Sequence, residues 1–156
     1  MRPDRNPSLV IPAQAVAAIA LCATAGLPLT SVAAALCFPL VEYAAHRWAF
    51  HGPAAAIHEA HHRYPSDLSH FTVPVWITVA VSLAAAVVSP AVAGGLLAGM
   101  CLYDLAHLAC HGRAWFPFRR ALAAHHALHH AQPGKNFSVS FPPIDSLLCS
   151  RAKKQK

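Results

Sequence analysis

The chain has 156 residues, of which 56% are hydrophobic and only 12% are charged, and its formal net charge is +6. With a mean hydropathy of +0.41, it is too apolar for an ordinary small soluble domain and long enough for only one compact unit. We therefore expect a single membrane domain over residues 1–156. The positive charge then indicates membrane topology and attraction to anionic lipid headgroups, and we expect no nucleic-acid partner.

The first apolar stretch lies between Arg5 and Glu42, and its 36 residues include no Asp, Glu, Lys or Arg. A single helix of that length would measure about 54 Å, whereas the hydrocarbon core of a bilayer is about 30 Å thick. The turn signal Gly26-Leu27-Pro28 lies near the middle of the stretch. The pattern therefore predicts two short membrane spans, approximately 9–25 and 29–41.

Two histidine clusters follow this stretch. His46 and His51 are five residues apart and do not share a face of an ideal helix, so this pair predicts a helix end or a distorted helix. His58, His61 and His62 are three and four residues apart, a spacing that lets one helix aim three imidazoles at a single point.

A second uncharged stretch of the same length lies between Asp67 and Asp104. Its turn signal, Ser89-Pro90, again lies near the middle, so it predicts two further spans, approximately 73–88 and 91–103. Three glycines in the last span match no phosphate-binding motif and are typical of close helix packing: Gly94, Gly95 and Gly99.

The last two histidine clusters follow the second stretch and again have helical spacing. Their members are His107, His111, His125, His126, His129 and His130. Eleven of the twelve histidines thus fall into four clusters, and only His70 stands alone. Neutral imidazole is the commonest metal ligand in proteins and suits zinc, copper, iron and nickel. The clusters therefore predict metal binding, with enough imidazoles for two ions.

Two hairpins of helices would place all four clusters and all twelve basic residues, including the tail 151–156, on one side of the membrane. By the positive-inside rule that side is the cytoplasm. We therefore expect an all-α integral membrane fold of four short transmembrane helices, arranged as two hairpins with a cytoplasmic histidine-rich helical cap. The expected location is a bacterial inner membrane, with both termini cytoplasmic. A cleaved signal peptide starting at Arg2 and Arg5 is less favoured, because its removal would leave an odd number of spans.

The sequence His58-Glu59-Ala60-His61-His62 also satisfies H-E-x-x-H, the zinc protease signature, with Glu59 as the general base. That interpretation uses two histidines and leaves at least eight unexplained. An intramembrane zinc protease is therefore a less favoured alternative, and a non-catalytic metal-binding or transport protein is another.

The order HxxxxH, HxxHH, HxxxH, HxxHH resembles the fatty acid hydroxylase/sterol desaturase superfamily of integral-membrane histidine-box di-iron enzymes. Four further segments resemble that family: Tyr43-Ala-Ala-His46-Arg47, His61-His62-Arg63-Tyr64-Pro65-Ser66-Asp67, Asn136-Phe137-Ser138-Val139-Ser140 and Ile144-Asp145-Ser146-Leu147-Leu148. The resemblance covers approximately residues 43–149. It implies a di-iron, O2-dependent oxidoreductase that hydroxylates a fatty acyl chain or a related lipid taken from the bilayer.

By that resemblance the metal ligands would be His46, His51, His58, His61, His62, His107, His111, His126, His129 and His130. The cofactors would be two iron ions, with O2 as co-substrate, and zinc is a possible substitute in purified protein because it binds nitrogen ligands more tightly than ferrous iron. No separate catalytic side chain is assigned. Candidates for contacts outside the ligand shell are His125, Asp67, Asp104 and Asn136. For the two aspartates helix capping is an equal alternative, and for His125 and Asn136 simple exposure is the alternative.

The sequence leaves two classes of lipid as candidate substrates. Only six residues separate His51 from His58, which is similar to the carotenoid beta-ring hydroxylases, whereas Asn136-Phe137 and Tyr64-Pro65 resemble the fatty acid and sterol branch. We expect a fatty acyl or related substrate, with carotenoid beta-ring hydroxylation as the alternative.

The chain shows no motif for an electron-transfer module, so we expect a separate electron donor of the ferredoxin or cytochrome type. Arg113, Arg119 and Arg120 could dock such a donor, although contact with lipid phosphates is the simpler role.

Overall fold

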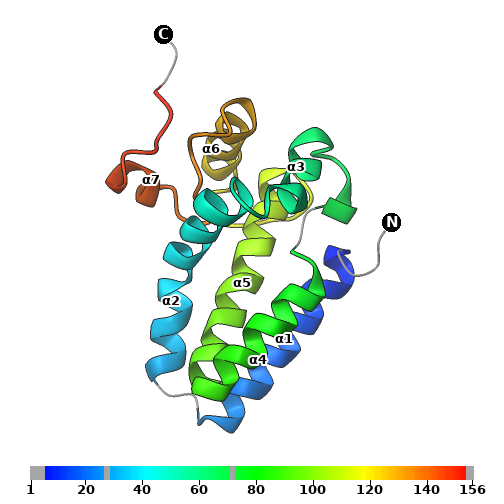
Figure 1. Ribbon diagram of the computed structural model, residues 1–156, viewed down its shortest axis with the longest axis vertical. Coiled ribbons are helices and arrows are strands. Elements are labelled where there is room, and N and C mark those ends of the chain that lie inside the picture. Colours follow the sequence, from blue (N-terminus) through cyan, green and yellow to red (C-terminus); the bar gives the residue numbers. More distant parts are fainter. Residues whose placement is uncertain (1–5, 27–28, 71–72, 154–156) are drawn as a thin grey trace. The chain divides into compact units, whose positions relative to one another are not determined.

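A computed structural model describes residues 6–26, 29–70 and 73–153, and within these ranges the chain is helical and contains no strand. Seven α-helices follow one another (Figure 1): α1 Pro7–Thr24, α2 Leu29–Ala44, α3 Ala55–Arg63, α4 Val75–Val88, α5 Pro90–Cys110, α6 Arg119–Ala131 and α7 Pro143–Leu147. A π-helical turn, η2, occupies Ala45–Phe50, and a short 3-10 turn, η3, occupies Leu68–His70. Several residues of the expected turn and of the basic ends lie outside the described residues: Arg2, Arg5, Leu27, Pro28, Lys154 and Lys156.

Among the described residues, three helical segments are long and apolar enough to cross a membrane, namely Pro7–Thr24, Leu29–Phe50 and Pro90–Cys110. The remaining expected span corresponds to a shorter apolar helix, Trp76–Val88. The all-helical class and the membrane-spanning character are therefore confirmed, while a count of four spans stays a prediction.

Two helices continue beyond the residues at which membrane spans were expected to end. The spans were expected to end near residues 41 and 103, and the helical segments extend to Phe50 and Cys110. The limits of the spans themselves stay a prediction. Glu42 and Asp104 are the first acidic residues after the two uncharged stretches, and both lie inside helices. A buried carboxylate ends an uncharged stretch of sequence but does not interrupt the backbone hydrogen bonds of a helix.

The chain divides into two compact units. The span unit comprises residues 1–38 and 67–104, and the histidine unit comprises residues 39–66 and 105–156. Helices α2 and α5 contribute residues to both units. All four histidine clusters fall in the histidine unit, and most of the apolar helical sequence falls in the span unit.

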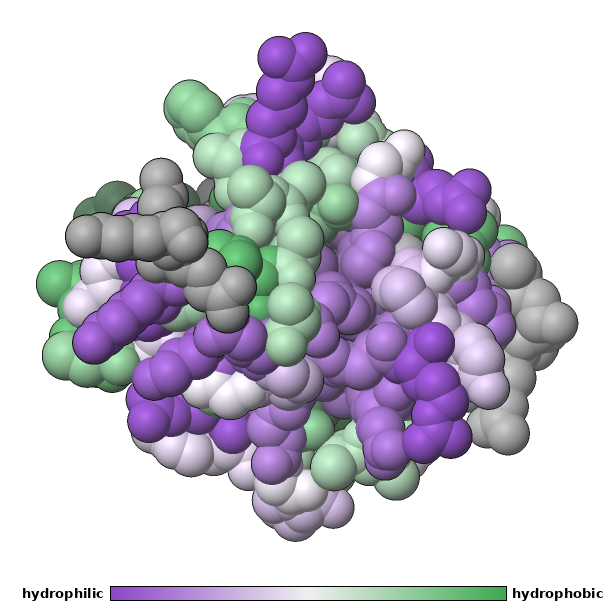
Figure 2. All heavy atoms as spheres, turned by 90° about the horizontal axis from the view of Figure 1, so that it is seen from above, coloured by the Kyte–Doolittle hydropathy of each residue, from purple (hydrophilic) through white to green (hydrophobic). Residues whose placement is uncertain are grey.

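Large apolar side chains cover the outside of the span unit. On α1, Val16 and Ile19 are 68% and 69% exposed, and on α4, Val87 and Val88 are 88% and 86% exposed. A water-soluble helix would place such side chains inward, so this pattern indicates contact with lipid. The face of the histidine unit seen in Figure 2 is mostly hydrophilic by comparison.

Within the span unit, three glycines of α5 allow close contact with α1 and α2. A Cβ atom at Gly94 would lie 2.8 Å from the Sγ of Cys22, one at Gly95 would overlap the backbone oxygen of Ser31, and one at Gly99 would overlap the Phe38 ring. Membrane helices associate through such small residues because lipid supplies no hydrophobic drive between helices. The helix packing expected from the glycines is confirmed.

Replacing Gly95 with Ala should destabilise the protein. The added methyl group meets backbone rather than a movable side chain, so the overlap should cost about 1–3 kcal/mol and outweigh the gain in helix propensity of about 1 kcal/mol. The midpoint of thermal unfolding in detergent measures the effect. Gly134→Ala is the matched control, because a Cβ there meets nothing within 4 Å. Equal midpoints for the two variants would contradict the packing role.

Candidate metal centre

The histidine unit gathers nine imidazoles into two groups that could each hold a metal ion. In each group the candidate ligand nitrogens all lie within 4.8 Å of one another. The first group is His46, His51, His58, His62 and His129, and the second is His61, His111, His126 and His130. His107 adjoins the second group, since its Nε2 lies 3.0 Å from that of His61 and 3.1 Å from that of His126. All ten histidines expected as ligands thus come together.

Local helix geometry produces this convergence. The π-helical turn η2 aligns His46 with His51, and the amide of His51 donates to the carbonyl of His46 at 3.2 Å, a bond between residues five apart. The distortion expected from that spacing is confirmed. Helix α3 presents His58 and His62 one turn apart, with their Nε2 atoms 2.9 Å from each other.

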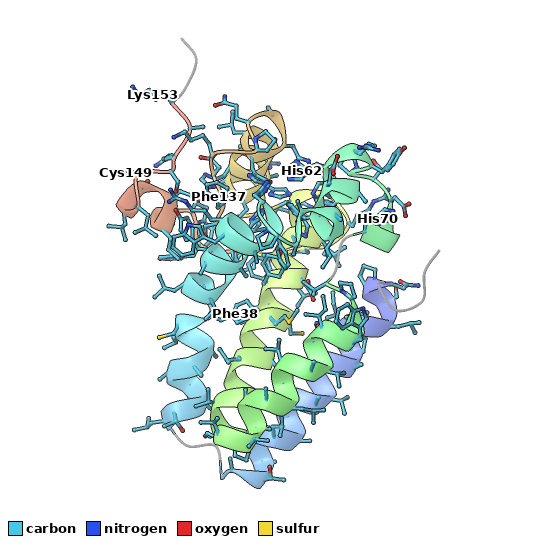
Figure 3. The ribbon with its side chains drawn as sticks, in the orientation of Figure 1. Phe38, His62, His70, Phe137, Cys149 and Lys153 are labelled. Carbon is cyan, nitrogen blue, oxygen red and sulfur yellow. The ribbon has the colours of Figure 1, made fainter. Side chains whose placement is uncertain are left out.

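Helix α6 repeats the arrangement of α3 with His126 and His130, whose Nε2 atoms are 3.0 Å apart. Its His129 turns instead toward the first group and places its Nε2 3.0 Å from that of His62. One helix thus supplies both groups. Figure 3 shows His62 among the crowded imidazole side chains of this unit.

The nitrogen spacings fit a shared metal ion. Two nitrogens bound at about 2.1 Å and at right angles to each other lie about 3.0 Å apart. Several Nε2 pairs have this separation, including His46 with His58 at 2.9 Å and His111 with His126 at 3.0 Å. Such a donor set, composed only of nitrogen, suits iron or zinc better than magnesium or calcium, which prefer oxygen.

The two groups are neighbours. The rings of His62 and His130, one from each group, have centroids 4.5 Å apart, and those of His126 and His129 are 5.7 Å apart. The arrangement can therefore hold two ions side by side.

Burial keeps these imidazoles neutral. Burial is the larger cause and nearby positive groups add to it, and together they lower the pKa of His62, His111 and His130 to about 4 and that of His129 to about 3. Burial and neighbouring imidazoles also lower the pKa of His58, His61 and His126. Neutral imidazole is the form that binds metal, so these side chains are in the ligating state at neutral pH.

The metal-free protein should lose stability as the pH falls from about 6.5 to about 4. Unfolded histidines have a pKa of about 6.5, so between these pH values the unfolded chain binds more protons than the folded one. The free energy of unfolding therefore decreases as the pH is lowered. We expect the thermal midpoint at pH 4.5 to be lower than at pH 7 by about 5 °C or more, since 1 kcal/mol shifts it by about 2–4 °C. His70→Gln, outside both groups, should leave this pH dependence unchanged. A flat profile would contradict the burial argument.

Two of the histidines expected as ligands are hydrogen-bonded by backbone carbonyls. The Nδ1 of His129 donates to the carbonyl of Lys135 at 2.7 Å, and the Nδ1 of His46 donates to the carbonyl of Phe137 in a short hydrogen bond. A carbonyl can only accept, so each Nδ1 carries the proton and each Nε2 is free to bind metal. Sequence reasoning missed these contacts, because a backbone carbonyl leaves no signature in residue type.

Two of the expected outer residues are buried rather than exposed. His125 is 8% exposed and its Nε2 donates to the Oδ2 of Asp145 at 3.0 Å. Asn136 is 1% exposed, donates from Nδ2 to the carbonyl of His125 at 3.0 Å, and accepts the amide of Ala152 at 2.7 Å. Asn136 therefore ties the chain after α7 to the helix that carries the last histidine cluster.

The other two expected outer residues, Asp67 and Asp104, belong to the span unit. The carboxylate of Asp67 lies 3.7 Å from the Nε2 of His70. Asp104 is buried, as is Gln14 in the same unit. A role for either aspartate toward a ligand stays a prediction.

Sequence reasoning also missed a chain of hydrogen bonds that ends on Asp145. Arg47 donates to the Tyr43 hydroxyl at 2.6 Å, that hydroxyl lies 2.9 Å from the Ser150 Oγ, and Ser150 donates to Asp145 at 2.7 Å. Burial raises the pKa of Asp145, but hydrogen bonds from His125, Ser150 and two backbone amides outweigh burial and hold the pKa below its usual value. Asp145 is therefore an ionised carboxylate at neutral pH.

Glu59, the general base of the protease alternative, lies on the surface. Its carboxylate pairs with Arg63 at 2.8 Å, and both side chains are 64% exposed. Neither group of candidate metal ligands includes it. A general base must lie within hydrogen-bond reach of the reacting water, so this position does not favour a protease.

The sequence is similar to a known protein family and to several characterised proteins. The family model described as fatty acid hydroxylase matches residues 31–150. A dihydroceramide fatty acyl 2-hydroxylase of Arabidopsis thaliana is 30% identical over an alignment of 115 residues. The match covers 61% of this chain and 48% of the plant protein. The chain thus spans about half the length of that relative.

Two beta-carotene hydroxylases of Paracoccus sp., from strains N81106 / MBIC 01143 and PC1, are each 32% identical over 140 residues. These matches cover 74% of this chain and 85% of each relative. No solved structure matches the chain.

Proposed function

Because the chain belongs to the fatty acid hydroxylase family, we propose that it is a membrane-bound, O2-dependent lipid hydroxylase whose clustered histidines hold two iron ions. The observation that carries this proposal is the pair of adjacent imidazole groups, each with its nitrogens within 4.8 Å of one another. A zinc protease or a simple metal carrier needs no second group beside the first.

The proposed ligands divide by group. One ion would be held by His46, His51, His58, His62 and His129, and the other by His61, His107, His111, His126 and His130. When bound, a pair of iron ions supplies the redox chemistry that uses O2 to hydroxylate an unreactive C–H bond.

The protein's own contribution is to present neutral nitrogens in a dry site. His46, His61 and His129 are at most 1% exposed, so water is largely excluded from these ligands. His46 and His129 keep their Nδ1 protons on backbone carbonyls, which leaves Nε2 unprotonated toward the ion.

The substrate we propose is a fatty acyl or related lipid taken from the bilayer. The apolar exterior of the span unit, with side chains such as Val16 and Val87 largely exposed, supports access from lipid rather than from water. A carotenoid beta-ring is the second candidate, and the 85% coverage of the two Paracoccus beta-carotene hydroxylases favours it.

We further propose that the chain acts as one membrane domain of four spans in a bacterial inner membrane, with the histidine unit and both termini in the cytoplasm. Exposed basic residues of that unit, including Arg63, Arg119 and Arg120, support this orientation. A separate ferredoxin or cytochrome would supply the electrons.

High-resolution mass spectrometry of total lipids and carotenoids tests the proposal in cells that express the wild-type chain with a supplied reductase. We expect species heavier by one oxygen atom, and their identity distinguishes a fatty acyl substrate from a carotenoid. His61→Ala and His129→Ala should each reduce these species to the level of cells without the protein, because each removes a ligand from one group.

Glu59→Gln is the matched control on the same histidine-bearing helix as His61, and it should retain the oxygenated product because Glu59 is exposed and paired with Arg63. Loss of the oxygenated product with Glu59→Gln would contradict the peripheral position assigned to Glu59. Identical lipid profiles for wild type and both histidine variants would refute the hydroxylase.

A further inference from the structure

The loop that follows α6 approaches the metal centre through its backbone. The carbonyl of Lys135 accepts from His129 and the carbonyl of Phe137 accepts from His46. Both histidines belong to the first group of ligands. By contrast, the Nδ1 of His62, in the same group, and the Nδ1 of His126, in the second group, are buried without a hydrogen-bond partner in the described part of the chain.

Two carboxylates hold this loop in place. The amides of Phe137 and Ser138 donate to Oδ1 and Oδ2 of Asp145, each at 2.8 Å. The next two amides, of Val139 and Ser140, donate to Oε1 of Glu42, and the Ser140 hydroxyl donates to Oε2. Four successive backbone amides are therefore bound by side chains that come from α7 and α2.

Both carboxylates are inaccessible to solvent. Asp145 is 0% exposed and Glu42 is 5% exposed. Asp145 also accepts from Ser150 and His125, so each of its oxygens has two donors. A buried carboxylate is costly unless it is fully hydrogen-bonded, so such donors fix its position closely. The carbonyl of Phe137 shares a peptide unit with the bound amide of Ser138, so it is fixed together with Asp145. The carbonyl of Lys135 shares a peptide unit with the amide of Asn136, which donates to the carbonyl of Ser150 at 3.0 Å, and Ser150 in turn donates to Asp145.

We propose that Glu42 and Asp145 are positioning residues for one of the two metal sites, acting through the loop carbonyls that orient His46 and His129. This inference rests on the proposed function, because it requires that the histidines bind metal. The metal sites of the first and second histidine groups are then inequivalent. The site of the first group depends on the loop, and the site of the second group does not. Outer contacts of this kind typically change metal affinity by about 10–100-fold.

Titration of the purified, metal-free protein in detergent with Co2+ tests this inference, with visible absorption as the readout and a competing chelator to set affinity. We expect the wild type to bind two equivalents. In Asp145→Asn, the side-chain NH2 replaces one carboxylate oxygen and faces a loop N–H group, which loses its acceptor. One equivalent of Co2+ should therefore bind about 10–100-fold more weakly, and the affinity for the other equivalent should be unchanged. Glu42→Gln should weaken the same equivalent.

Combined variants identify which site is affected. In the Asp145→Asn background, His129→Ala should cause little further loss, because both changes act on the first site, whereas His126→Ala should abolish the remaining binding. Glu59→Gln, an acid-to-amide change at the surface, is the control and should bind both equivalents normally. If Asp145→Asn does not fold, Ser150→Ala removes only one donor to Asp145 and should weaken the same equivalent to a smaller degree.

The outcomes separate the two proposals. A wild type that binds fewer than two Co2+ ions contradicts the two-metal function itself. A wild type with two ions, together with an Asp145→Asn variant that binds both normally or weakens both equally, overturns only the positioning role.

Discussion

The structure depends on bringing ten imidazoles together while keeping them uncharged. An imidazolium among these neighbours would be both desolvated and repelled, which is why burial lowers the pKa of His62 and His130 to about 4. The nitrogens can therefore approach to about 3 Å, the separation found between His126 and His130. Helical spacing, the π-helical turn and the loop after α6 all serve this approach, since each determines where an imidazole nitrogen lies.

The protein uses carboxylates away from the ligands rather than among them. Neither group of candidate ligands in the described residues contains an acidic side chain. Instead Glu42 and Asp145 accept hydrogen bonds from backbone amides of the loop 137–140. Their burial is tolerated because every carboxylate oxygen is hydrogen-bonded, and the carbonyl of Phe137 that accepts from His46 shares a peptide unit with one of the bound amides. In the span unit, by contrast, close packing depends on small residues such as Gly95, which let the backbones of neighbouring helices come into contact.

Much of this could be predicted from the sequence, for identifiable reasons. Hydropathy indicates membrane helices directly, and the periodicity of the α-helix indicates which histidines converge; even the distortion between His46 and His51 follows from their spacing. Hydropathy alone does not give the ends of helices α2 and α5, because Glu42 and Asp104 end an apolar pattern without ending a helix. The carbonyls of Lys135 and Phe137 were not predictable, because the path of a loop is set by tertiary contacts. The burial of His125 was left open for the same reason, since its partner Asp145 is distant in sequence.

The π-helical turn also determines how the sequence can change in length. It holds one residue more than an α-helical turn between the same hydrogen-bonded ends, from the carbonyl of His46 to the amide of His51. A regular α-helix through the present sequence would rotate His51 and every following side chain by about 100° about the helix axis, away from the first group. Deleting one residue between the two histidines would instead let an ordinary α-helical turn join the same ends, with the second histidine still one turn beyond His46. A relative that is one residue shorter in this segment could therefore complete the same site with a regular helix, whereas a further insertion would displace His51.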